Sequence, residues 1–174
     1  MLAALHVWSA VLLTVVVCVA AGTKIRSAQA FQSFSTGLTP FGWLPAPLRR
    51  TTAVVVVLAE VFTGLLAWVA PRFGAALSLV LLLVFTTATL QAGRASNCHC
   101  FGDSEGTEVG GTALFVSRNV VLATATVLLA LPVAGLPALP ISFAAGSGGL
   151  LIAALAIRAD DIAYLFARGS IPVR

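Results

Sequence analysis

The stretch TAVVVVLAEVFTGLLAWVA, residues 52–70, decides which class of fold this sequence can adopt. Glu60 is its only charged residue, and a helix needs about 20 mainly apolar residues to cross the hydrocarbon core of a bilayer. Apolar stretches of similar length recur at 2–22, 73–92 and 112–131. A fifth, at 141–159, is weakened by Gly146, Gly148 and Gly149. The pattern predicts four transmembrane helices and a fifth, C-terminal membrane helix.

The composition of the 174-residue chain supports the same conclusion. Hydrophobic residues make up 59% of it and charged residues 9%, whereas soluble domains contain roughly 25% charged residues. The formal net charge of +4 comes without a basic, aromatic-rich cluster, so we interpret it as a topology signal and predict no nucleic-acid partner. We therefore predict an all-α integral membrane protein. It forms a single multi-pass domain over 1–174 in the lipid bilayer of the inner or plasma membrane.

The longest loop between predicted spans, 23–51, contains Phe31 and Phe34 within the stretch 28–38. Their spacing, with polar residues between them, predicts a short amphipathic helix on the membrane surface. Since successive spans alternate in direction, this loop and the loop at 93–111 lie on the same side of the membrane. The amphipathic helix is therefore placed to act as a lid over the second loop.

Two charged residues fall inside predicted spans. Glu60 lies eight residues into the second span and Arg118 six residues into the fourth, which puts both about 9–12 Å below the same face at roughly 1.5 Å per residue. A charge inside the bilayer usually faces the bundle and finds a partner. We predict that Glu60 pairs with Arg118 and that Asn119 and Gln91 complete the network. The alternative is that each charge is accommodated separately.

The loop at 93–111 contains the stretch SNCHCFGDSEG, residues 96–106. Cys98 and Cys100 are separated by one residue, and such a pair can form a small, strained and easily reduced disulfide when the backbone turns. It closes almost no loop, so it suits exchange better than stabilisation. His99, when protonated, favours the thiolate that attacks a disulfide. We favour redox chemistry, with Cys98 and Cys100 as the catalytic residues; a structural turn is the alternative.

Metal binding suits this stretch less well, and we predict no metal site. Adjacent residues cannot all point at one ion without distortion, and zinc ligands are usually spaced C-x2-C or wider. No second Cys/His cluster supplies a fourth ligand, so Glu105 would have to serve. No phosphate-binding, dinucleotide-binding or Ser-His-Asp pattern occurs in the sequence, so its motifs indicate no cofactor.

Cys18 lies six residues before Lys24, near the same face as the cysteine pair. We interpret it first as a small apolar residue that packs within a helix. The alternative is a third thiol that exchanges with Cys98 or Cys100.

Four short motifs occur in order from the first predicted span to the fourth: AGTKIR at 21–26, AEVFTG at 59–64, CHCFG at 98–102 and VSRNVVL at 116–122. They resemble motifs of the methylamine utilisation protein MauE family, which is related to DoxX-like membrane proteins. In this resemblance, Lys24 corresponds to the lysine after the first helix, and Glu60 and Gly64 correspond to the E-x-x-x-G of the second span. Cys98, Cys100 and Gly102 correspond to the C-x-C-F-G signature. Arg118 and Asn119 correspond to the Arg-Asn of the fourth span. His99 departs from the family, in which a smaller residue is expected.

The resemblance implies a multi-span helical protein that assists maturation of the methylamine dehydrogenase β-subunit, a disulfide-containing periplasmic client, alongside a thioredoxin-like partner. A general thiol-redox membrane protein of the same family is an alternative. Vitamin K epoxide reductase and DsbB-type oxidases also carry a cysteine pair at one face of four membrane helices, and this analogy suggests a quinone as electron acceptor. A non-enzymatic assembly factor and a small-molecule transporter are the competing functions.

The distribution of Lys and Arg conflicts with an oxidising role. With five spans, both long loops and the C-terminal tail share one side and carry every Lys and Arg outside the spans except Arg72. The positive-inside rule then puts the cysteine loop on the cytoplasmic side. Oxidation of exported proteins requires the opposite side, where disulfides persist. The charge distribution favours the cytoplasmic side, where reduction or electron relay is the expected chemistry.

Overall fold

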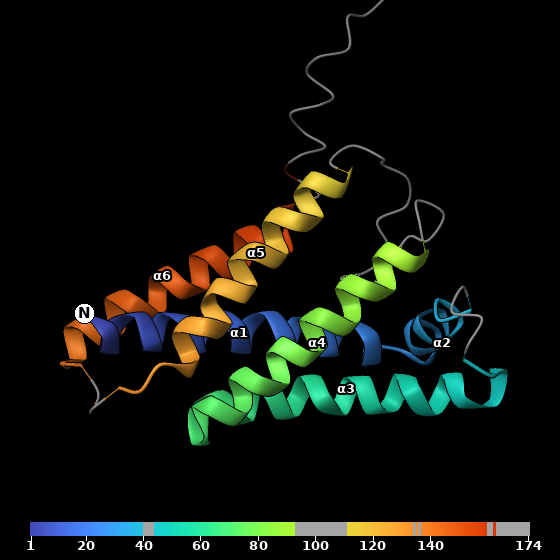
Figure 1. Cartoon of the computed structure of the whole chain (residues 1–174), viewed down its shortest axis with the longest axis horizontal. Helices are drawn as coiled ribbons and strands as arrows, with labels where there is room; N and C mark the ends of the chain where they lie inside the picture. Colours follow the sequence, from blue (N-terminus) through green and yellow to red (C-terminus); the bar gives the residue numbers. More distant parts are fainter. Residues whose placement is uncertain (40–43, 93–110, 134, 136, 160–161, 163–174) are drawn as a thin grey trace, which may run out of the picture.

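The structure, a computed structural model, describes residues 1–39, 44–92, 111–133, 135, 137–159 and 162. These residues form the helices α1 (Leu2–Ile25), α2 (Ala28–Thr36), α3 (Ala46–Val69), α4 (Pro71–Ala92), α5 (Gly111–Ala130) and α6 (Leu139–Ile157) (Figure 1). Four of them, α1, α3, α4 and α6, include stretches long and apolar enough to cross a membrane. The described apolar part of α5, Phe115–Ala130, is shorter. The predicted all-α multi-pass membrane fold is confirmed.

Helix α1 lies at the centre of the bundle, where it packs against α3, α5 and α6, while α4 packs against α3 and α5. Successive long helices alternate in direction, so α1 and α4 end where α3 and α5 begin (Figure 1). We call this end of the bundle, on the right in Figure 1, the α2 end, because α2 lies there and packs on α1 and α3.

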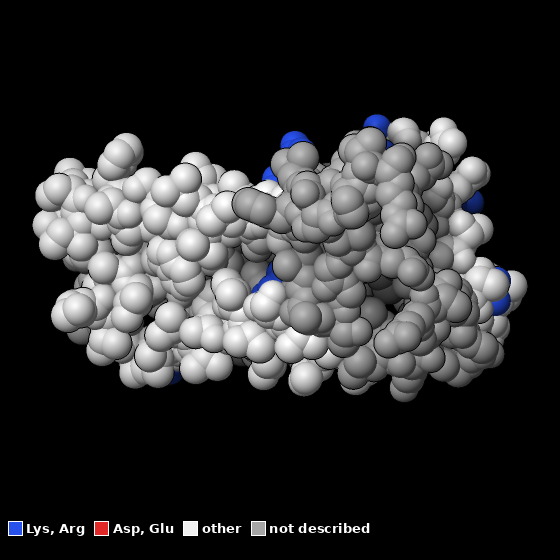
Figure 2. All heavy atoms as spheres, turned by 90° about the horizontal axis from the view of Figure 1, so that it is seen from above, with Lys and Arg blue, Asp and Glu red and all other residues white. Residues whose placement is uncertain are grey.

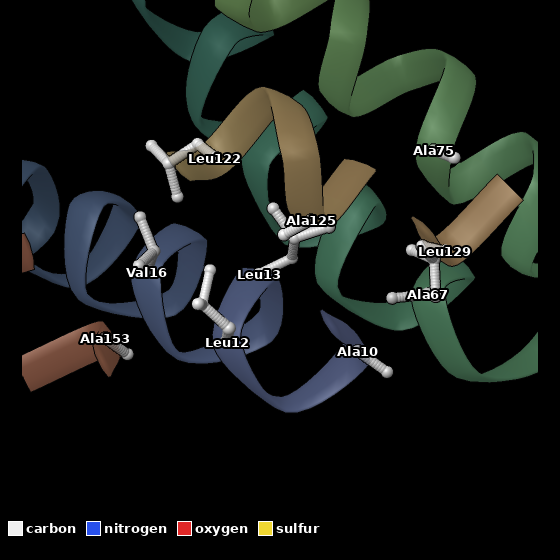
Figure 3. Close-up of a cluster of buried hydrophobic side chains, with 10 residues drawn as sticks. All are labelled: Ala10, Leu12, Leu13, Val16, Ala67, Ala75, Leu122, Ala125, Leu129 and Ala153. Atoms are coloured by element: carbon white, nitrogen blue, oxygen red, sulfur yellow. The ribbon is translucent and has the colours of Figure 1, made fainter. Parts of the chain in front are cut away.

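The core follows one face of α1. It consists of Ala10, Leu12, Leu13 and Val16 from α1 with Ala67, Ala75, Leu122, Ala125, Leu129 and Ala153 from the other long helices (Figure 3). Many of these side chains are small, which lets helix backbones approach closely where lipid supplies no hydrophobic drive for association. The buried hydroxyls of Ser78 and Thr126, 3.1 Å apart, add a hydrogen bond between α4 and α5.

The glycines of α6 form its contact with α1. A Cβ on Gly149 would lie 2.6 Å from the carbonyl oxygen of Trp8, and one on Gly148 would lie 3.4 Å from the Trp8 ring. The absence of a side chain at Gly149 therefore allows the two backbones to cross closely. The fifth predicted span was the weakest prediction because glycine has a low helix propensity. Packing against α1 offsets this cost, and α6 forms from Leu139 to Ile157.

The helices α1 and α3 extend furthest past the boundaries predicted from hydropathy. α1 continues to Ile25, which includes Lys24 in its last turn. α3 begins at Ala46, which places Arg49 and Arg50 in its first turns and not in the preceding loop. Because of these extensions, Lys24, Arg49 and Arg50 are helical residues at the α2 end. The candidate site depends on the position of Lys24.

Candidate functional site

A buried ion pair joins α1 to α3 at the α2 end. The Nζ of Lys24 lies 2.6 Å from Oε1 of Glu60, and the two residues are 2% and 3% exposed. The same Nζ donates a second hydrogen bond to the carbonyl oxygen of Ala20, at 3.2 Å. Charges withdrawn from water to this degree are stable only when they are paired and hydrogen-bonded.

The position of Lys24 follows from the extension of α1. A cation in the last turn of a helix interacts favourably with the negative end of the helix dipole and can donate to a backbone carbonyl group there. Lys24 does both, because Ala20 lies one turn earlier on α1. The Lys24 side chain is long enough for its ammonium group to contact Glu60 on α3, which packs directly against α1.

Two aromatic rings complete the surroundings of the ammonium group. The centroid of the Phe34 ring lies 5.1 Å from Lys24 Nζ and that of Phe85 lies 5.7 Å from it. Both distances are within the range of cation–π attraction. Phe34 comes from α2 and Phe85 from α4, so four helices meet around one ammonium group.

Helix α2 covers this group with its apolar side. Phe34 is its buried residue, 7% exposed, and the helix packs on α1 and α3. The Oγ of Ser27 caps α2 by accepting a hydrogen bond from the backbone N–H of Ala30, at 3.0 Å. The predicted amphipathic helix is thus present, with Phe34 directed at the ion pair. Whether α2 also covers the 93–110 loop is a prediction that lies outside the described residues.

The substitution Phe34→Ala is expected to loosen α2 without unfolding the bundle. It removes the buried side chain of α2 and one of the two rings around Lys24, and truncation of a fully buried Phe costs about 3–5 kcal/mol. The backbone amides of 28–36 should exchange with deuterium at least about tenfold faster, while those of α1 and α3 change little. Phe31→Ala, at a half-buried position on the same helix, is the control. Equal effects of the two substitutions would contradict a specific role for Phe34.

The second carboxylate oxygen of Glu60 is a hydrogen-bond acceptor that the site leaves unsatisfied. Oε2 is buried and has no hydrogen-bond partner among the residues that the structure describes. A buried carboxylate oxygen costs free energy unless a donor reaches it. Lys24 neutralises the charge of Glu60, and Oε2 is left as an acceptor for a hydrogen-bond donor at the α2 end.

The predicted partner of Glu60 was wrong, because the structure pairs Glu60 with Lys24 and not with Arg118. Among the described residues, α3 and α5 both pack on α1 and α4 but make little contact with each other. Equal depth in the membrane therefore does not bring Glu60 and Arg118 together. The guanidinium carbon of Arg118 lies 5.9 Å from the ring centroid of Phe115 on its own helix.

Asn119 takes part in a separate contact between α4 and α5. Its Nδ2 donates to Oγ1 of Thr86 at 3.2 Å. The two residues line a groove of about 270 Å³ whose other walls are apolar, formed by side chains such as Leu82, Phe115 and Val120. Asn119 therefore contributes to helix packing and to this groove, and the predicted network with Glu60 is not formed.

Cys18 packs at the interface of α1 and α3 and is also exposed on the outside of the bundle. A Cβ built on Gly64 would lie 3.7 Å from its Sγ, an ordinary contact distance. Its role as a packing residue and its exchange with a second thiol both stay predictions.

The cysteine motif lies outside the described residues, which applies to Cys98, His99, Cys100 and Gly102. The helices on either side of it are described, and they place its two ends. α4 ends at Ala92 and α5 begins at Gly111, both at the α2 end of the bundle (Figure 1). The segment that carries the motif is therefore anchored at the same end as the buried ion pair.

Three residues of the site were missed by sequence reasoning: Lys24 as the partner of Glu60, and the two aromatic residues Phe34 and Phe85. A signal for Lys24 was present, because it follows an apolar run by only two residues and a buried carboxylate requires a cation nearby. No comparable signal distinguished Phe34 and Phe85 from phenylalanines that face lipid.

A comparison with protein families adds one finding to this geometry. The family model described as methylamine utilisation protein MauE matches residues 2–136. The match includes α1 to α5, and with them Lys24, Phe34, Glu60 and Phe85, while α6 lies beyond it. No curated protein and no solved structure is significantly similar to the chain.

Proposed function

The chain belongs to the MauE family, and from this premise we propose that it is a multi-pass membrane protein of thiol–disulfide exchange that supports maturation of a disulfide-containing client. Cys98 and Cys100 are the reacting residues in this proposal. In this proposal the Lys24–Glu60 pair sets the electrostatic field at the α2 end. The family description names methylamine utilisation, and the client that we propose is of the methylamine dehydrogenase β-subunit type.

The exchange proceeds in two attacks. The thiolate of one cysteine attacks a disulfide of the client, forms a mixed disulfide and releases one client thiolate. The second cysteine then attacks the mixed disulfide and releases the other. The client gains two electrons and two protons, and a Cys98–Cys100 disulfide forms. A thioredoxin-like dithiol returns this disulfide to the reduced form; in the reverse direction the client is oxidised and a quinone accepts the electrons.

The buried ion pair is the observation that supports this proposal. Ionisable residues inside a membrane are costly and usually mark a functional site, and this pair lies at the end of the bundle where the cysteine segment is anchored. Phe85, which touches Lys24, precedes the end of α4 by seven residues, or about 10 Å of helix. Cys98 follows that end by six residues, which extend at most about 20 Å. The chain length therefore permits the thiols to work close to the pair.

Trapping the thiols in membranes tests the proposal. After an acid quench and labelling with a maleimide mass tag, the Cys98–Cys100 pair should change by two tags between reductant and oxidant. Cys98→Ser should abolish exchange, whereas Cys18→Ser should leave the shift of two tags intact. A pair that never changes its redox state would contradict the proposal. Full function in a chain with both Cys98→Ser and Cys100→Ser would favour a non-enzymatic assembly factor.

A further inference from the structure

The first turns of α3 concentrate positive charge at the α2 end. Arg49 and Arg50 lie there, no acidic residue accompanies them in the first turn, and the N-cap residue, Pro45, supplies no side-chain hydrogen bond. The N-terminus of a helix already carries a partial positive charge, which repels cations and attracts anions. The arrangement favours an anion in front of these residues.

Arg49 is partly fixed in place. Its Nη1 donates to Oγ1 of Thr39, just beyond the end of α2, at 3.4 Å. Its Nε is buried and has no acceptor among the residues that the structure describes. Arg50 is exposed beside it. A guanidinium group presents several N–H donors in a planar geometry that suits the oxygens of a phosphate group.

Within the described part of the chain, Glu60 is the only carboxylate side chain, and Lys24 already engages it. Figure 2 accordingly shows blue atoms and no red ones on the described surface in view, with blue at the right-hand end. The anion for Arg49 and Arg50 is therefore expected to come from outside this part of the protein.

The surface below the arginines is apolar. Val54, one turn beyond Arg50 on the same face of α3, is 43% exposed, and Val61, two turns beyond Val54, is 49% exposed. A charged group followed along a membrane helix by exposed apolar side chains matches an amphiphile with an anionic head and an acyl chain. This pattern favours a lipid over a free phosphate ion.

We propose that Arg49 and Arg50 at the start of α3 bind the phosphate group of an anionic phospholipid, whose acyl chain lies along Val54 and Val61. A basic residue near the membrane surface strengthens binding of anionic lipid about fivefold. The bound lipid anchors the start of α3, and through Thr39 the end of α2, to the membrane surface. The site is independent of the proposed thiol chemistry.

The test uses the full chain in detergent and follows retained lipid by native mass spectrometry, with phosphatidylglycerol and phosphatidylcholine as probes. The wild-type chain should prefer phosphatidylglycerol, and the double variant Arg49→Gln/Arg50→Gln should lose about 10- to 30-fold of that preference. Arg72→Gln is the matched control, because Arg72 lies in the first turn of α4 at the opposite end of the bundle. It should change the preference by at most about fivefold, the effect of a single basic residue. Thermal unfolding of each variant verifies that it is folded.

Three outcomes would overturn the proposal. The first is a wild-type chain that does not distinguish the two lipids, and the second is an equal loss in the Arg72→Gln control. The third is displacement of phosphatidylglycerol by millimolar inorganic phosphate alone, which would identify a free phosphate ion as the ligand.

Discussion

Replacing Glu60 with alanine is expected to lower the free energy of unfolding by about 3–5 kcal/mol, because Lys24 would remain as a buried charge without a partner. Lys24→Met should have a similar effect through the carboxylate that it leaves behind. Glu60→Gln should fall between wild type and Glu60→Ala, since an amide oxygen still accepts the hydrogen bond from Lys24 but no longer carries the charge. Denaturant or thermal unfolding of the purified chain in detergent provides the measurement.

The double variant Lys24→Met/Glu60→Leu separates stability from function. Two apolar side chains of similar volume can replace a buried ion pair at little or no cost, so the double variant should be more stable than either single variant. If the double variant folds but no longer exchanges disulfides, the ion pair contributes to the exchange reaction and not only to stability. Equal destabilisation in the single and double variants would contradict the view that the unpaired charge causes the loss. Full exchange in the folded double variant would remove the ion pair from the proposed function.

The helices could be predicted from the sequence because hydropathy reports directly on transfer into lipid. Their ends were harder, and the errors have one cause. A predicted span stops at the first charged residue, so Lys24, Arg49 and Arg50 were assigned to loops. In the structure each of them extends a helix, because a long side chain carries its charged group to a partner or to the membrane surface while its backbone stays helical.

The partner of Glu60 could not be predicted because sequence position gives the depth of a residue but not its direction around the bundle. Arg118 has the right depth, and it lies on α5, which packs on α1 and α4. Lys24 lies on α1, the direct neighbour of α3. The sequence also does not show whether the apolar face of α2 contacts lipid or the helix bundle, because a residue such as Phe34 can pack against either.

Gly149→Ala is expected to destabilise the bundle by about 1–3 kcal/mol, the usual cost of overpacking. The new Cβ would lie 2.6 Å from the carbonyl oxygen of Trp8, and a backbone atom cannot move aside as a flexible side chain can. α6 would have to shift away from α1, its neighbour along the core. Unfolding of the full chain in detergent measures the loss.

The same helix contains its own control. A Cβ on Gly146 would meet Cγ2 of Val11 at 3.8 Å, an ordinary contact, so Gly146→Ala should stabilise the chain by up to about 1 kcal/mol through helix propensity. The two substitutions make the same chemical change three residues apart, yet they are expected to have opposite signs. Stabilisation by both would mean that propensity alone governs α6 and that the close crossing with α1 contributes nothing. Opposite signs would show that close backbone packing holds α6 in place, because propensity predicts the same sign at both positions.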